Sequence, residues 1–479
     1  MSTQISATSD LVVPANFIQA VRESGYLSLS TALAELIDNS LQAKATEVAI
    51  SISSEPTTGL PVIVVEDNGA GMNRRELEDC LRFGGSRRFN GRTSFGRFGM
   101  GLPAASLSQA RRVEVTAWQR GGPVFQVALD VDAIAAGELA SLEARRLGQS
   151  ETESGCCVTW RSCDRIDYRR LGWLDRALRR DLGRMYRRLL AQGVSLSLNG
   201  AAVEPDDPMM LEKRVEGATA SVTFDDQIYE LATPDGGTST VKVRFAMLPV
   251  QRWHRLDNVT KRRLGIVGGG GVSILRAGRE IAYGWYLMGG KRKENYDDWW
   301  RCEIEFEPVL DEHFGITINK QGIRPSPELR NALAPELEAI ARILNARVRQ
   351  AFEDIKFQSA AAASCLVAEA ADADLPVLPN SGGAGQSLRY RIGTAQLPPG
   401  AMFSADLQDG TLEVQLNVDH PAFKAIYQPL QALPEETGSG LRTAIELLVL
   451  ALGRSAVMEN ACDFMNQLGE TYGRMLQRA

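Results

Sequence analysis

Three short segments near the amino terminus carry residues whose types and spacing suit phosphate chemistry. The first is AELIDNS, where Glu35 and Asn39 are four residues apart, so a helix would place both on one face. On such a face a carboxylate can accept a proton from a water molecule, and an amide oxygen is a ligand suited to Mg²⁺. Taken alone, the pair also fits an ordinary solvated helix face.

The second segment is VEDNGAGM, in which Asp67 follows an apolar, strand-like run and precedes Gly69 and Gly71. A carboxylate at a strand end can accept a hydrogen bond from the exocyclic amine of adenine. Because glycine has no Cβ, the two glycines allow a ring to approach the backbone closely. The alternative is a plain glycine turn.

The third segment, FGRFGMGLPAAS, places Gly96, Gly99 and Gly101 before a run of small, helix-forming residues. Backbone N–H groups in such a loop and at the helix start can face phosphates. It is not a Walker loop, because no Gly-Lys-Ser/Thr follows, and no strand immediately precedes it, as a nicotinamide fingerprint requires. The three segments follow one another at intervals of about 30 residues, and together they predict a site for ATP and Mg²⁺.

Periodicity predicts the elements that must position these residues. Apolar residues form one helical stripe within residues 27–43, and serines lie near its start, which together predict a capped helix. The β-branched runs predict strands of one sheet at residues 47–53, 61–66, 113–119 and 124–129.

A second group of elements follows. Apolar residues every three or four positions among many charges predict one long amphipathic helix over residues 164–192. The Asn199-Gly200 pair is a hairpin signal, and further strand-like segments occur within residues 222–248 and 266–285. An amphipathic helix is expected at residues 327–352, then a loose linker containing AAAASC and NSGGAGQS, and finally a helical pattern from Leu441.

Composition and charge set limits on the class of protein. Of the 479 residues, 23% are charged and 44% hydrophobic, as in folded globular proteins. No apolar run is long enough to span a bilayer and no secretion signal is visible, so we expect a cytoplasmic protein without membrane association. Seven cysteines without CxxC spacing make disulfides and structural zinc unexpected. The net charge of −6 gives no overall attraction to nucleic acid, although clustered arginines suit local basic surfaces.

The segments AELIDNSLQAKATEVAI, VEDNGAGM and FGRFGMGLPAAS resemble the GHKL ATPases, the superfamily of gyrase B, ninety-kilodalton heat-shock chaperones, histidine kinases and MutL. The resemblance implies a Bergerat-type α/β sandwich that holds ATP and Mg²⁺ against a helical layer. By that match Glu35 is the general base, Asn39 the Mg²⁺ ligand and Asp67 the adenine-binding residue, and residues 82–98 form a mobile lid. The nucleotide-binding residues that we predict are Asn39, Asp67, Gly69, Gly71, Met72, Gly96, Phe98, Gly99, Met100, Gly101 and Thr159.

The fourth family motif departs from its usual pattern. Where Gly-Thr is usual, this chain has Gly155 followed by Cys156. A thiol is a poor hydrogen-bond donor, so support of the Asp67 end of the site is expected to be weaker or to come from Ser154 or Thr159. Alternatively, Cys156 is structural.

The stretch LDEHFGITINKQGIRP resembles the transducer domain of MORC proteins, MutL and type II topoisomerase B subunits. In that domain a loop lysine reaches the γ-phosphate, and Lys320 is its counterpart, which makes it a second predicted catalytic residue. The alternative is a surface lysine. The resemblance runs from about Phe17 to about Arg349, and ELIDNS, FGGSRR and NKQG look most like MORC-type and prokaryotic MORC-like ATPases.

The expected fold class is α+β, with a Bergerat-type ATPase domain, a transducer-like α+β domain and a small carboxy-terminal α/β region. The corresponding bounds are 1–195 for the ATP-binding domain, 196–355 for the transducer-like domain, 356–387 for a linker and 388–479 for a region of unknown role.

Our leading functional hypothesis is an ATP-operated clamp that forms a homodimer and acts on DNA or in a DNA-associated complex. Basic residues on the 164–192 helix, at 251–263 and around Lys291 to Lys293 would contact phosphates, unless the helix is only a solvated, arginine-rich surface. A second hypothesis is a chaperone-like ATPase that remodels protein clients. A third is a nucleotide-gated scaffold that works with partner proteins, for example in prokaryotic defence.

Overall fold

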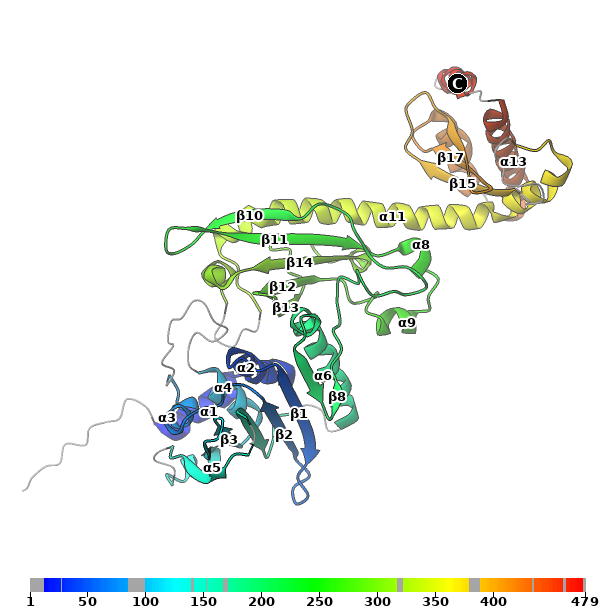
Figure 1. Cartoon of the computed structure of the whole chain (residues 1–479). Coiled ribbons are helices and arrows are strands. Elements are labelled where there is room, and N and C mark those ends of the chain that lie inside the picture. Colours follow the sequence, from blue (N-terminus) through cyan, green and yellow to red (C-terminus); the bar gives the residue numbers. More distant parts are fainter. Residues whose placement is uncertain are drawn as a thin grey trace, which may run out of the picture. The chain divides into compact units, whose positions relative to one another are not determined.

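The computed structural model describes residues 13–26, 28–84, 100–138, 142–151, 153–166, 171–316, 322–378, 388–432, 435–459 and 462–476. The chain divides into two compact units, Met1–Leu344 and Asn345–Ala479 (Figure 1). Both units combine strands with helices, so the fold class is α+β, as predicted.

The amino-terminal sheet is built from β1 (Glu47–Ser54), β2 (Pro61–Asp67), β3 (Arg112–Trp118), β4 (Pro123–Asp130), β5 (Arg145–Gln149), β6 (Gly155–Arg161), β7 (Ser195–Leu198) and β8 (Ala201–Ala202). Among the described residues the strand order is β5-β4-β3-β6-β2-β1-β7-β8. Neighbouring strands are antiparallel, apart from the parallel pair β1 and β7. The four strands expected in this part of the chain are confirmed as β1 to β4.

The helices of this region are α1 (Pro14–Ser24), α2 (Leu29–Gln42), α3 (Arg74–Cys80), α4 (Gly101–Gln109) and α5 (Val131–Ala135). Helix α2 confirms the helix expected within residues 27–43, and it begins after Ser28, whose hydroxyl accepts a hydrogen bond from the Thr31 amide. Apolar residues of α2 and α4 share one buried cluster with the sheet. Trp160 of β6 donates a hydrogen bond of 2.8 Å to the Ser106 hydroxyl, which ties α4 to the sheet.

The segment expected to be one long helix is divided into α6 (Leu171–Met185) and α7 (Arg187–Ala191). Tyr186 lies at the break and is fully buried. The Asn199-Gly200 turn is confirmed, with φ of 50° and 77°, and it joins β7 to β8. Since this hairpin pairs with β1, a domain boundary at residue 195 would cut the amino-terminal sheet.

The second sheet of the first unit contains β9 (Ser221–Val222), β10 (Gln227–Ala232), β11 (Thr238–Met247), β12 (Val272–Arg276), β13 (Arg279–Gly284) and β14 (Trp300–Phe306). In the described residues its order is β10-β11-β14-β12-β13, with β9 on β11. Strand β14 was not expected, although its alternating charges at 301, 303 and 305 are a strand signal.

Short helices connect the strands of the second sheet: α8 (Val250–Trp253), α9 (Asn258–Arg263) and η1 (Asn295–Trp299). Two more, η2 (Pro308–Leu310) and α10 (Asp311–Phe314), follow its last strand. Helix α11 (Pro327–Ala371) then begins. Its leucines at 329, 333 and 337 are fully buried in the core of the second sheet, because a spacing of four residues keeps them on one face.

Residues 356–371 do not form the expected linker, because they continue α11. This stretch is rich in alanine and contains neither glycine nor proline, so its local preference is helical. The glycine-rich segment 379–387 lies outside the described residues. The NSGGAGQS part of the linker prediction is therefore untested.

The second unit also contains β15 (Arg389–Ala395), β16 (Phe403–Gln408), β17 (Thr411–Asn417), α12 (Gln428–Ala432), α13 (Glu435–Glu459) and α14 (Cys462–Leu476). Strand β17 is central, parallel to β15 and antiparallel to β16. The helical pattern expected from Leu441 lies within α13. None of the helices in the described residues combines the length and the apolar character that a bilayer crossing requires.

Candidate nucleotide-binding site

Helix α2 carries the acid and the amide that the sequence singled out. Glu35 lies in the middle of the helix and is only 4% exposed, whereas Asn39, one turn later, is half-buried. Both therefore project from one side of α2, as their spacing predicts. Burial of an acid within a helix is unusual for a structural residue, because a carboxylate loses hydration there.

The Glu35 carboxylate lies against the start of α4. A Cβ placed on Gly101 would come within 2.7 Å of Glu35 Oε2, so this position tolerates no side chain while the carboxylate stays in place. Met100 caps the same helix start without a side-chain hydrogen bond. The Glu35 carboxylate therefore lies next to the amino-terminal end of α4. Gly96, Phe98 and Gly99 lie outside the described residues, as does most of the expected lid.

Asp67 ends β2 and is held in a fixed orientation. Its Oδ2 accepts a hydrogen bond of 2.7 Å from the Ser40 hydroxyl, and its Oδ1 accepts one of 2.9 Å from the Gly69 amide. Burial raises the pKa of Asp67, and the two hydrogen bonds oppose this shift. Ser40 is a site residue that the sequence analysis missed, although it directly follows Asn39 in the motif.

The glycines after Asp67 are required by close backbone contacts. Gly71 has φ of +66°, and a Cβ there would lie 1.9 Å from the Trp118 carbonyl oxygen. A Cβ on Gly69 would lie 2.9 Å from the Ala43 methyl group. Met72 is half-buried and packs against the core of the domain. The turn therefore brings open backbone next to the Asp67 carboxylate.

Strand β6 carries the unusual fourth motif. Cys156 lies directly opposite Asp67 in the β2–β6 pair, and burial raises the pKa of its thiol well above the usual value. A neutral thiol therefore faces the carboxylate. Ser154 supports the turn instead, because its hydroxyl donates a hydrogen bond of 2.7 Å to the Gly69 carbonyl oxygen.

The prediction that Thr159 binds the nucleotide is wrong. In the β2–β6 pair Thr159 lies opposite Val64, whereas Cys156 lies opposite Asp67. Val64 and Asp67 are three residues apart. Successive residues of a strand project to opposite faces, so residues three apart do too, and Thr159 and Asp67 lie on different faces of the sheet. Consistently, the Thr159 hydroxyl is 3.9 Å from the thiol of Cys157.

Three arginines of α6 and α7 are engaged in ion pairs with the second sheet. Arg187 is buried and bonds Glu280 and Glu303 at 3.0 and 2.7 Å. Arg184 bonds Glu280 at 2.6 Å, and Arg188 pairs with Glu303 and Glu305. These contacts fix the helices to the second sheet, and they engage three of the arginines that were expected to contact DNA phosphates.

Lys291 and Lys293, which were also predicted to contact phosphates, form ion pairs as well. The Lys291 ammonium lies 2.8 Å from Asp297 Oδ2, and the Lys293 ammonium lies 3.1 Å from Asp298 Oδ1. Both acids come from the same short segment, so the positive charges are largely compensated locally. Residues 251–263 are the third basic segment that was predicted to contact phosphates.

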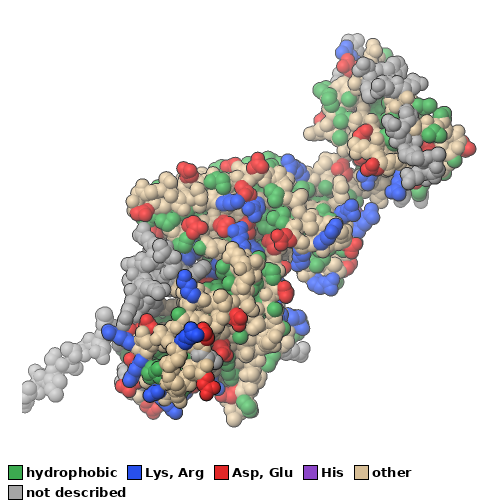
Figure 2. Space-filling view, in the orientation of Figure 1, with side chains coloured by type: hydrophobic (Ala, Val, Ile, Leu, Met, Phe, Trp, Pro, Cys, Tyr) green, Lys and Arg blue, Asp and Glu red, His purple; other side chains and the backbone are tan. Residues whose placement is uncertain are grey.

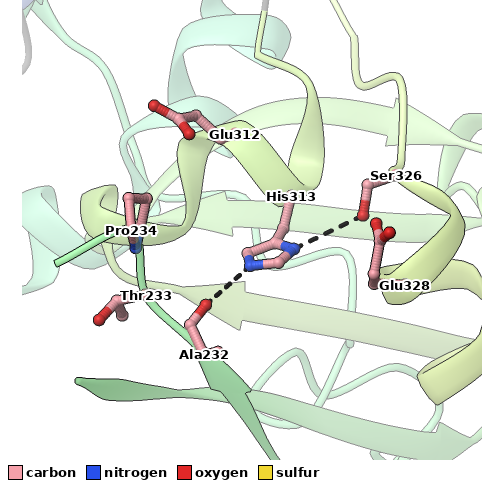
Figure 3. A pocket seen from close by; sticks show the side chains of 7 residues that line it. All are labelled: Ala232, Thr233, Pro234, Glu312, His313, Ser326 and Glu328. Atoms are coloured by element: carbon pink, nitrogen blue, oxygen red, sulfur yellow. Dashed lines mark hydrogen bonds between the residues drawn. The ribbon is translucent and has the colours of Figure 1, made fainter. Parts of the chain in front are cut away.

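A pocket of about 370 Å³ is lined partly by residues that flank, in the sequence, the segment 317–321, which lies outside the described residues. His313 of α10 faces the Ala232 carbonyl oxygen at 2.8 Å and the Ser326 hydroxyl at 3.5 Å, and Glu312 and Glu328 lie nearby (Figure 3). His313 thus contacts both the end of β10 and Ser326, the residue before α11. Lys320 itself lies outside the described residues, so its role stays a prediction.

The domain is of the α+β class, and it combines an acid and an amide one helical turn apart, an aspartate at a strand end, and a glycine turn. Residues 27–155 match the family model described as "Histidine kinase-, DNA gyrase B-, and HSP90-like ATPase". This amino-terminal domain therefore belongs to the GHKL ATPase superfamily, as predicted.

Two plant proteins resemble the chain. It is 35% identical over 94 residues to Protein MICRORCHIDIA 5 of Arabidopsis thaliana, a stretch that covers 19% of this chain and 13% of that protein. It is 32% identical over 79 residues to Protein MICRORCHIDIA 4, covering 16% and 10%. The similarity to MORC proteins is thus shown, and it spans about an eighth or less of their length.

Proposed function

We propose that this protein binds ATP with Mg²⁺ and hydrolyses it with Glu35 as the general base. The observation that carries the proposal is the contact between the buried Glu35 carboxylate and Gly101 at the start of α4. Phosphates at that helix start would lie beside the acid, because helix amino ends attract anions. A water molecule between them would have its proton acceptor within reach.

The residues present suit both parts of the ligand. Asp67 is oriented by Ser40 and Gly69, so one carboxylate edge is set to accept a hydrogen bond from the adenine amine. Asn39 is half-buried on the same helix as Glu35, and its amide oxygen is the kind of hard ligand that Mg²⁺ takes. When bound, the metal ion would neutralise charge on the phosphates.

The test separates binding from hydrolysis. Glu35→Gln keeps the shape of the side chain but removes its basicity, so it should bind a non-hydrolysable ATP analogue normally and lose at least about 100-fold in phosphate release. Asp67→Asn should lose binding, because its amide presents a donor where the adenine amine needs an acceptor. Wild-type turnover by Glu35→Gln would overturn the assignment of the base.

We further infer that the protein is an ATP-gated, dimerising clamp that acts on DNA. Since Arg184, Arg187 and Arg188 are engaged, the phosphate-contacting surface would be the α8–α9 patch, which we define as Arg252, Arg255, Arg262 and Arg263. All four side chains are exposed, and none forms a salt bridge with another described residue. Figure 2 shows Lys and Arg side chains on this part of the surface.

Salt-dependent DNA binding tests the α8–α9 patch. The double variant Arg262→Ala, Arg263→Ala should weaken duplex binding and reduce the salt slope by about two, because each phosphate contact releases a counterion. Arg145→Ala, Arg146→Ala is the matched control, since both arginines are exposed on β5. Equal loss in both double variants would contradict the assignment. ATPase stimulation by unfolded protein but not by duplex would favour a chaperone-like role.

A further inference from the structure

A buried ion pair joins the second sheet to helix α2. Arg279, the first residue of β13, places its Nε 3.0 Å from Oδ1 of Asp38. The Arg279 and Asp38 side chains are only 5% and 1% exposed. Asp38 directly precedes Asn39 and lies three residues after Glu35, so the pair forms within the helical turn that carries both proposed functional side chains.

Tyr186 completes this contact from a third element. Its hydroxyl lies 2.8 Å from Asp38 Oδ1 and 2.9 Å from the Ala34 carbonyl oxygen, and its ring lies under the Arg279 guanidinium at 5.6 Å. Tyr186 occupies the break between α6 and α7. The Asp38 carboxylate is therefore enclosed by a charge from the second sheet and a hydroxyl from the connecting helices.

The charges around Arg279 stabilise its ionised form. Burial tends to lower the pKa of Arg279, but Asp38, Tyr186 and Glu35 act against burial and raise this pKa above its usual value. The guanidinium is thus held in its charged form beside two acids of α2. Without it, Asp38 would be a buried carboxylate with its main counter-charge removed, which is costly enough to shift the helix.

The second sheet has other attachments that do not involve α2. Glu280, the residue after Arg279, bonds both Arg184 and Arg187, and Glu303 bonds Arg187 from β14. These bonds hold β13 against α6 and α7 even when residue 279 is changed. A substitution of Arg279 should therefore disturb α2 more than it disturbs the packing of the sheet.

We propose that Arg279 is a positioning residue for ATP hydrolysis, which holds Asp38 and thereby sets the placement of Glu35 and Asn39 on α2. Turnover then depends on where the second sheet sits, since Arg279 belongs to that sheet. The inference rests on the proposed ATPase function. Arg279 acts on the turn of α2 that carries Glu35 and Asn39, so its effect should fall on the rate of hydrolysis rather than on adenine binding.

The test compares two buried arginines of the same β12–β13 hairpin. Arg279→Met should lower kcat about 10- to 100-fold, because small misplacements of catalytic groups cost that much, and should change the Kd of a non-hydrolysable ATP analogue less than about 3-fold. Arg276→Met is the control: Arg276 is equally buried, and its Nε pairs with Asp311 at 2.6 Å, away from α2. It should keep kcat near the wild-type value.

Asp38→Asn removes the negative charge of the same ion pair. It should lower kcat to a similar degree, and the double variant should lose little more than either single variant, because both remove one interaction. Arg279→Lys, which keeps the charge, should recover part of the rate. If Arg279→Met does not fold, Asp38→Asn carries the test.

Two results would overturn the inference: wild-type kcat in folded Arg279→Met or Asp38→Asn, or equal kcat losses in Arg279→Met and Arg276→Met. A wild-type protein that binds or hydrolyses no ATP would instead overturn the proposed function itself. The two failures are therefore distinguishable in one series of measurements.

Discussion

At the scale of single residues, Asp67 links the acidity of a carboxyl group to ligand affinity. Burial raises its pKa, so the group takes up a proton at a higher pH than an ordinary aspartate does. Only the ionised form accepts the hydrogen bond from the adenine amine without competition from its own proton. Affinity should therefore be present above the raised pKa and be lost as the pH falls through it.

We predict that ATP-analogue affinity declines on acidification, with a midpoint above the usual range of aspartate. Ser40→Ala removes a hydrogen bond that favours the ionised carboxylate, so its midpoint should move to higher pH. Titration calorimetry at a series of pH values measures both midpoints. A Ser40→Ala midpoint at or below that of the wild type would contradict this reading of the site.

At the scale of elements, the contact between α2 and α4 makes Gly101 a sensitive position. Gly101→Ala places a Cβ 2.7 Å from Glu35 Oε2, so the carboxylate must move. We predict at least about a 10-fold loss of kcat, since general-base catalysis depends on placement. Stability should hardly fall, because alanine favours the helix.

Gly172→Ala in α6 is the control for this substitution. A Cβ at Gly172 would meet no atom within 4 Å, so the helix should gain stability by up to about 1 kcal/mol without loss of turnover. Phosphate-release rates and thermal melts of the two variants make the comparison. Equal kcat values would show that Glu35 is not confined by Gly101.

The attachment of α7 to the second sheet gives a prediction about stability. Arg187→Met removes the counter-charge that Glu280 and Glu303 share but leaves each of them a second arginine, so the free energy of unfolding should fall by about 1–3 kcal/mol. Arg180→Met is the control, since Arg180 is exposed and should change stability by less than about 0.5 kcal/mol. Urea unfolding measures both, and DNA affinity should stay unchanged in Arg187→Met if that arginine contacts no phosphate.

At the scale of the whole molecule, the proposed clamp predicts a change of mass. ATP can shift an open form to a dimer only as far as it binds the dimer better, and the γ-phosphate supplies that difference. Light scattering should therefore show a doubled mass with Mg²⁺ and a non-hydrolysable analogue, but not with ADP. Asp67→Asn should stay monomeric under both conditions, and a mass independent of nucleotide would contradict the clamp.

Much of the nucleotide site was predictable from the sequence because its parts are local. Glu35 and Asn39 are related by one helical turn, and Asp67 by its place at the end of an apolar strand. Gly71 is set by a turn that only glycine fits. In each case a few neighbouring residues determine the backbone, and the backbone determines the direction of the side chain.

Only the tertiary structure decided the contacts between segments that lie far apart in the chain. The Ser40–Asp67 hydrogen bond, the side of the sheet on which Thr159 lies and the pairing of Asp38 with Arg279 depend on strand register and helix placement. The arginine-rich helix shows the reason most clearly. Its spacing of charges predicts an exposed face, but whether a guanidinium meets water, a phosphate or Glu280 is decided by what the rest of the chain brings beside it.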